Sequence, residues 1–113
     1  MLSMIDAKKI IEELNLVPLP SEGGFYTESY RSKVMIEKDS LPSTYKGART
    51  ASTAIYFLLT PADFSAMHRV PGTEIFHLYM GGPVETTLLF ENGTGEVVTI
   101  GTDIELGERP QLV

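Results

Sequence analysis

The first apolar positions of the chain lie three or four residues apart, which is the spacing of one face of an α-helix. They are Ala7, Ile10, Ile11 and Leu14. Ser3 and Asp6 come before this face and belong to the residue types that begin helices. Pro18 and Pro20 follow it and cannot continue a helix. The pattern predicts one short amphipathic helix near the N-terminus.

After this helix the apolar positions follow the pattern of β-strands and turns. Segments rich in β-branched and aromatic residues alternate with segments of Gly, Pro and Asn, which interrupt strands. The predicted strands are residues 25–32, 34–36, 52–59, 64–70, 74–80, 84–90 and 97–100. We expect residues 38–49 to form one long surface loop, and we expect no second helix.

Many short strands at regular spacing indicate a sandwich or a closed barrel, because these arrangements bury one face of each strand and leave few edges exposed. The 113 residues, 42% of them hydrophobic and 21% charged, suit one globular domain. We therefore expect residues 1–113 to form a single domain. Residues 106–113 look like the start of a further strand, so we also expect that this sequence lacks the domain's C-terminal strands.

The charge and composition of the chain exclude several classes of partner. The formal net charge of -6 does not attract phosphate backbones, so nucleic acid is not an expected ligand. The absence of cysteine removes disulfides, thiolate nucleophiles and cysteine-type zinc sites. Charged residues interrupt the N-terminal segment, and the longest apolar run, residues 54–59, is too short to span a bilayer. We expect a cytoplasmic protein with no membrane partner.

The main chemical signal is the clustering of the chain's two histidines, His68 and His77, around one carboxylate, Glu74. Two imidazoles near a carboxylate can bind a divalent metal, or they can act as acid and base while the carboxylate orients one ring. In a regular strand, residues an odd number apart face opposite sides, so Glu74 and His77 cannot both face one pocket. A bulge, or a Glu74 that lies in the turn, would remove this conflict.

The turn at Pro71 and Gly72 suggests how these residues meet. If the chain reverses there, the ends of the two flanking strands become neighbours, and His68 comes close to Glu74 on an apolar face. We therefore expect His68 to face the pocket beside Glu74, and His77 to lie in a different environment.

Aromatic and basic side chains supply further candidates for ligand binding. Tyrosine rings can stack on a sugar or an aromatic ring, and an arginine can hold a carboxylate or phosphate through two parallel hydrogen bonds. The candidates are Tyr26, Tyr30, Arg31, Tyr56 and Tyr79. The tight turn of residues 21–24, which contains Gly23 and Gly24, can admit a ligand or a backbone closely.

Three segments, residues 19–32, 52–59 and 68–79, together resemble a branch of small uncharacterised single-domain cupins with the RmlC-like jelly-roll fold. The most specific of them is the first, where Glu22, two glycines and an aromatic residue precede Tyr30 and Arg31.

The general cupin motif is matched only in part. By this resemblance His68 takes the place of the first histidine, Glu74 that of the glutamate and Gly81 that of the closing glycine. Val70 stands where the second metal-binding histidine belongs, and Ala62 replaces the opening glycine.

The resemblance implies a mainly β protein: a cupin-type double-stranded β-helix, or jelly-roll barrel, with one short N-terminal helix. It also implies a homodimer joined by strands and a pocket at the mouth of the barrel. Related cupins include sugar-nucleotide epimerases, sugar isomerases and metal oxygenases, so the fold alone does not select a function.

Our leading hypothesis is a pocket for a small polar molecule, a carbohydrate or sugar nucleotide, in which His68 is acid or base and Glu74 orients it. This resembles the metal-independent epimerase branch, and we expect no metal and no cofactor. One alternative is a metal-dependent cupin enzyme that uses His68, Glu74 and also His77. The other is a binding module without turnover, and the sequence leaves the choice between enzyme and binder open.

Overall fold

The computed structural model describes residues 6–113, so the helix start predicted at Ser3 lies outside the described residues. Apart from one α-helix and two 3₁₀ helices, the regular structure of this part of the chain is β-strand, as predicted. The chain divides into two compact units, the first ending at Pro71 and the second being Gly72–Val113.

The predicted N-terminal helix is confirmed as α1 (Ala7–Leu14). The Asp6 carboxylate accepts a hydrogen bond of 2.8 Å from the backbone N–H of Lys9 and so caps the first turn. Asn15 ends the helix in the left-handed conformation, with φ 55°. Lys9 and Glu13 form an exposed ion pair one turn apart on its surface.

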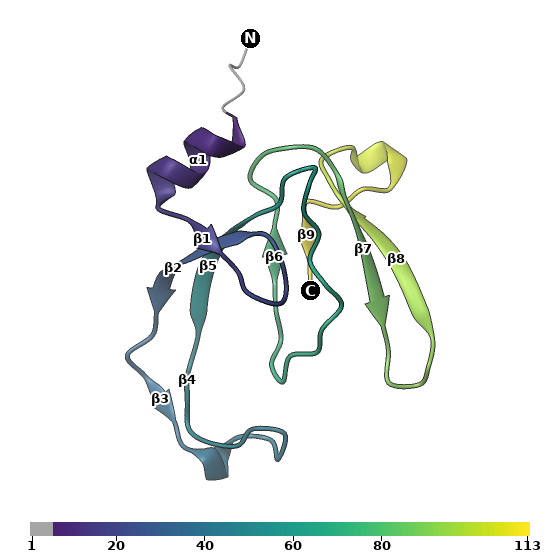
Figure 1. The fold of residues 1–113 in the computed structure, drawn as a ribbon. Coiled ribbons are helices and arrows are strands. Elements are labelled where there is room, and N and C mark those ends of the chain that lie inside the picture. The colour runs from purple at the N-terminus through teal and green to yellow at the C-terminus, as the bar shows by residue number, and fades with distance from the viewer. Residues whose placement is uncertain (1–5) are drawn as a thin grey trace. The chain divides into compact units, whose positions relative to one another are not determined.

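Three antiparallel strands of the first unit form a sheet in the order β1-β2-β5 (Figure 1). They are β1 (Val17–Pro18), β2 (Phe25–Arg31) and β5 (Thr53–Leu58). The segment after β2 also pairs with the segment before β5. The two short strands of this pair are β3 (Met35–Ile36) and β4 (Arg49–Thr50). The 3₁₀ helix η1 (Lys38–Ser40) lies in the predicted loop between them.

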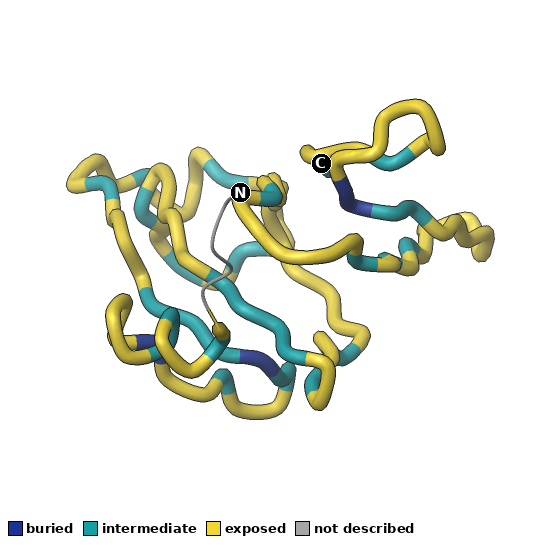
Figure 2. Tube along the Cα trace, turned by 90° about the horizontal axis from the view of Figure 1, so that it is seen from above, coloured by how far each residue is buried: buried dark blue, intermediate teal, exposed yellow. Residues whose placement is uncertain are grey.

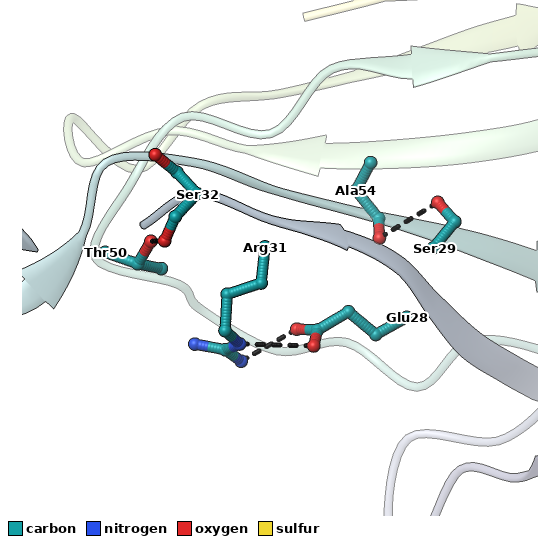
Figure 3. A network of polar contacts seen from close by, with 6 residues as sticks. All are labelled: Glu28, Ser29, Arg31, Ser32, Thr50 and Ala54. Carbon is teal, nitrogen blue, oxygen red and sulfur yellow. Dashed lines mark hydrogen bonds and ion pairs between the residues drawn. The ribbon is translucent and has the colours of Figure 1, made fainter. Parts of the chain in front are cut away.

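A β-bulge interrupts the pairing of β2 with β5. Glu28 pairs with Ile55, but Tyr30 pairs with the very next residue, Ala54, so Ser29 is the extra residue. The Ser29 hydroxyl donates a hydrogen bond of 3.2 Å to the Ala54 carbonyl, as Figure 3 shows. The bulge shifts the alternation of faces by one residue.

The second unit contains two antiparallel strand pairs and a short 3₁₀ helix. The strands are β6 (Phe76–His77) with β9 (Gln111–Leu112), and β7 (Val84–Leu89) with β8 (Gly95–Ile100). The turn between β7 and β8 contains Gly93 at φ 86°, which suits a residue without Cβ. The 3₁₀ helix η2 (Ile104–Leu106) follows β8, and the strand expected near the end of the chain is β9.

The strand predicted over residues 64–70 is wrong, and the one predicted over 74–80 is reduced to the two residues of β6. Within its own unit, the segment 64–70 makes a single backbone hydrogen bond, from the Ala66 N–H to the Glu22 carbonyl. A strand needs a run of backbone hydrogen bonds to a partner, and β6 has such a partner in β9. A hairpin around Pro71 and Gly72 would join the two units, so it stays a prediction.

The apolar core of the described residues is small. Leu16 in the first unit and Ile100 in the second are the buried hydrophobic side chains, at 6% and 7% exposure, and much of the tube in Figure 2 is exposed. The strands of residues 6–113 form separate sheets, none of which closes on itself. Closure into a jelly-roll barrel stays a prediction. None of the helices between residues 6 and 113 has the length and apolar character that a membrane crossing requires.

Candidate functional site

The tight turn before β2 is built from left-handed backbone. Ser21, Gly23 and Gly24 have φ values of 70°, 94° and 78°. The Leu19 N–H donates to the Gly24 carbonyl at 2.9 Å, and the Gly23 N–H donates to the Leu19 carbonyl at 3.2 Å. Two glycines suit this turn because left-handed backbone costs glycine no steric energy.

This turn holds the segment that carries His68. The Glu22 carbonyl accepts a hydrogen bond of 2.6 Å from the Ala66 N–H. At Gly23 the two backbones come so close that a Cβ would collide with the Phe64 carbonyl oxygen. We call these two contacts, Glu22 to Ala66 and Gly23 to Phe64, the backbone clamp. The sequence reasoning recognised a possible close approach at the paired glycines but not its partner.

The clamp also sets the state of the His68 ring. The Nδ1 atom of His68 lies 2.7 Å from the Ala66 carbonyl oxygen. A carbonyl only accepts hydrogen bonds, so Nδ1 carries the proton and donates. In the neutral ring Nε2 therefore has the free lone pair.

Glu22 supplies the carboxylate that faces this nitrogen. Its Oε2 lies 3.8 Å from His68 Nε2, which is longer than a hydrogen bond and within range of an ion pair if the ring is protonated. The side chains are 39% and 31% exposed, so a small molecule can reach both. The sequence reasoning did not assign Glu22 to the site. The sequence signal that could have found Glu22 is its position in residues 19–32, the most specific of the three segments that resemble cupins.

His77 is held in the opposite way. The side-chain amide nitrogen of Gln111 lies 3.3 Å from His77 Nδ1. An amide NH₂ group only donates, so Nδ1 accepts and the neutral ring carries its proton on Nε2. The Tyr79 ring lies 6.3 Å from the His77 ring, at 18° to it. The contacts from β9 and Tyr79 give His77 an aromatic and amide environment.

Glu74 lies in the second unit, on the exposed segment before β6, whereas His68 lies in the first unit. Their predicted pairing therefore stays a prediction. Within either unit, the described side chains form no group of three His, Asp or Glu that could hold a metal ion.

The register of β2 and β5 divides the predicted ligand-binding residues between two faces. Directly paired residues share a face, and side chains alternate along each strand. Tyr26 and Arg31 lie on the face of Phe57 and Thr53. Tyr30 and Tyr56 lie on the opposite face. The fifth candidate, Tyr79, lies beside His77 in the second unit.

The guanidinium of Arg31 is already paired within the chain. Its Nε and Nη2 atoms donate to the two Glu28 carboxylate oxygens at 3.1 and 2.7 Å (Figure 3). The hydrogen bonds to Glu28 and the attraction of its charge raise the pKa of Arg31. Residues three apart share a face here only because the bulge at Ser29 shifts the alternation. An anionic ligand would have to displace Glu28 from this arginine.

The second unit has an open hollow of about 580 Å³ between β8 and the segment after η2. Its lining includes Val97, Thr99, Leu106 and Arg109, together with the carboxylates of Glu96 and Glu108. None of the residues predicted for the site lines it.

The sequence matches the family described as "Cupin superfamily (DUF985)" over residues 8–113. Among curated proteins, the uncharacterized protein YML079W of Saccharomyces cerevisiae is 29% identical over 97 residues, covering 81% of this chain and 48% of that protein. Its printed name assigns it no activity.

Two solved structures are similar to this chain. A hypothetical protein from Leishmania major has a TM-score of 0.83 at 29% identity, and protein SO0799 from Shewanella oneidensis has 0.82 at 32%. Both alignments cover 96% of this chain, and 64% and 63% of those chains. The chain thus spans about half of the curated relative's length and less than two thirds of the two solved chains.

Proposed function

This chain belongs to the cupin superfamily (DUF985), as its resemblance predicted, and we propose that it binds a small polar molecule at His68. The proposed ligand is a carbohydrate or a sugar nucleotide. The proposed site contains His68 and Glu22, and Glu74, the carboxylate predicted to orient the ring, stays a separate candidate. Tyr26, Tyr30, Tyr56, Tyr79, Arg31 and His77 stay candidates for ligand contact.

The single observation that carries this proposal is the hydrogen bond from His68 Nδ1 to the Ala66 carbonyl. It holds the ring in the form in which the lone pair of Nε2 is free for a ligand. A ring held by a backbone carbonyl keeps its tautomer and orientation without a ligand present, and such preorganisation lowers the cost of binding.

The same arrangement suits acid–base chemistry of the epimerase or isomerase type. His68 Nε2 would take a proton from the carbon next to a sugar carbonyl, and the electron pair of that C–H bond would form an enolate. The protonated ring would then return the proton to the other face or to the neighbouring carbon. Without such a proton transfer the site is a binding module.

Binding and turnover can be tested separately. Glucose, galactose, UDP-glucose and UDP-galactose are titrated against the protein while the NMR signals of the two histidine rings are followed. At least one of these compounds should shift the His68 signals, and His68→Asn should weaken its binding about tenfold or more. Only glucose and galactose among the four have a carbonyl, in their open-chain form, so incorporation of solvent deuterium at carbon 2 of either sugar would identify turnover.

The outcomes separate the parts of the proposal. If none of the four compounds perturbs His68, the proposed ligand class is wrong. If His68→Asn weakens binding and Glu74→Gln does not, the role of Glu74 is wrong while that of His68 stands. Binding without deuterium incorporation selects the binding module.

Assembly and location stay part of the proposal. We propose that the protein is cytoplasmic. We also propose a homodimer, because the β2–β5 sheet exposes large side chains on both faces, among them Tyr30 at 55% and Ile55 at 47%. Light scattering that shows only monomer at micromolar concentration would contradict the dimer. We also propose a single jelly-roll domain that purifies without a stoichiometric transition metal, which elemental analysis checks.

A further inference from the structure

Glu22 and His68 present two hydrogen-bond acceptors side by side. The hydrogen bond at Nδ1 leaves Nε2 as an acceptor, and a carboxylate accepts only. Their nearest atoms are 3.8 Å apart. Within the first unit, residues 6–71, no side chain donates a hydrogen bond to either acceptor. When His68 is neutral, a ligand group that satisfies both acceptors therefore brings two donors.

Among the polar groups of a sugar or sugar nucleotide, the charge of the pair decides which group fits. A phosphate or carboxylate group would bring only acceptors and a negative charge next to Glu22, and both oppose binding. Two hydroxyl groups on adjacent carbons bring one O–H for each acceptor, at hydrogen-bond lengths of about 2.7 to 2.8 Å. Their spacing is fixed by the carbon skeleton, so they can meet two acceptors held a few ångströms apart.

The backbone clamp holds the two residues beside each other before any ligand arrives. Glu22 uses its carbonyl to bind the Ala66 N–H, and the carbonyl of the same Ala66 orients the His68 ring. The two acceptors thus belong to residues joined through a single intermediate residue. The His68 ring is already ordered by its hydrogen bond, so it loses little conformational entropy when a ligand binds.

We infer that Glu22 and His68 form a two-acceptor site for the vicinal diol of a sugar. This inference rests on the binding part of the proposed function and names the part of the ligand that the site contacts, because an Nε2 lone pair that accepts a hydroxyl hydrogen cannot at the same time take a proton from carbon. Glu22 takes one hydroxyl hydrogen and His68 Nε2 takes the other. If the ligand is a sugar nucleotide, its phosphates lie away from this pair.

A matched pair of glycosides tests the inference. Methyl β-D-ribofuranoside carries adjacent hydroxyls at carbons 2 and 3, and its 2-deoxy counterpart lacks one of them. In NMR titrations the diol should shift the ring signals of His68, and the deoxy compound should bind about tenfold more weakly. Glu22→Gln should weaken binding of the diol by a similar factor and leave the Nδ1–H form of His68 unchanged. Glu12→Gln, on the exposed surface of α1, should leave the affinity unchanged.

Three results would overturn the inference. Equal affinity for the two glycosides, with the His68 shift present, would do so while the proposed function survives. Unchanged binding in Glu22→Gln would show that the carboxylate is not a contact. A titration in which neither glycoside perturbs His68 would reject the diol, whereas the proposed ligand class is decided by the sugars and sugar nucleotides tested above.

Discussion

The two histidines show how differently the two units position the same side chain. In the first unit His68 is held by a backbone carbonyl, and that carbonyl is itself held by a turn of fixed shape. In the second unit His77 is held by the side-chain amide of Gln111, on a two-residue strand pair. Each contact involves a histidine ring that can rotate, but the partner of His68 is backbone and moves only with the chain, whereas the partner of His77 can also rotate away about single bonds. This difference is why the proposed site is placed in the first unit.

The largest effect should come from breaking the clamp. Gly23→Ala places a Cβ against the Phe64 carbonyl and forces alanine into a φ of 94°. Because the obstacle is backbone, we expect the free energy of unfolding to fall by about 2 to 4 kcal/mol. Thermal denaturation followed by circular dichroism measures the change.

Gly47→Ala is the matched control, because a Cβ at Gly47 meets nothing within 4 Å. Its effect should stay within about 0.5 kcal/mol. Equal melting temperatures for the two variants would contradict the clamp.

A smaller effect is expected at the corresponding close contact of the second unit. A Cβ on Gly101 would collide with the Glu108 side chain, which can rotate away. That rotation would break the hydrogen bond of 3.1 Å from the Asp103 N–H to the Glu108 carboxylate, so Gly101→Ala should cost about 1 kcal/mol. The double variant with Glu108→Ala should be no less stable than Glu108→Ala alone. If the losses in the free energy of unfolding add, Gly101 is needed for a reason other than its contact with Glu108.

The neutral rings of His68 and His77 should carry their protons on different nitrogens. A single substitution should change the tautomer of His77. In long-range ¹⁵N–¹H spectra of the neutral rings, His68 should carry its proton on Nδ1 and His77 on Nε2. Gln111→Leu removes the donor to His77 and should mix the tautomers of that ring, while His68 stays unchanged. Finding the same tautomer at both histidines of the unmodified protein would remove the contrast between the units.

The smallest effect is expected at the Glu28–Arg31 pair, which is exposed to solvent. The raised pKa of Arg31 means that the arginine is fully charged at neutral pH and that, on the alkaline side, the pair's contribution is lost when strong alkali titrates the arginine. Glu28→Gln should therefore lower the melting temperature equally at all pH values between about 6 and 10. The small loss should shrink further in concentrated salt. A loss that varied across this pH range would point to a different titrating group.

The family resemblance and the mainly β composition with one helix were both predictable, and both are confirmed. The location of the chemistry was predictable in part. His68 was selected because histidine is rare in this chain, and its predicted pairing with Glu74 would cross from one unit to the other and stays a prediction. The contact with Glu22 was missed because no local pattern joins a turn before β2 to a segment after β5.

The sequence by itself determined the elements whose hydrogen bonds are local. α1 follows from the spacing of its apolar residues and its Asp6 cap, and the β7–β8 hairpin follows from alternating strands around Asn92 and Gly93. Only the tertiary structure decided the pairing of β6 with β9, the bulge at Ser29 and the clamp that orients His68. The physical reason is that every backbone N–H and carbonyl is chemically alike. A side-chain pattern can therefore specify which face of a strand is buried, but the choice among distant partners is made by the packing of the whole chain.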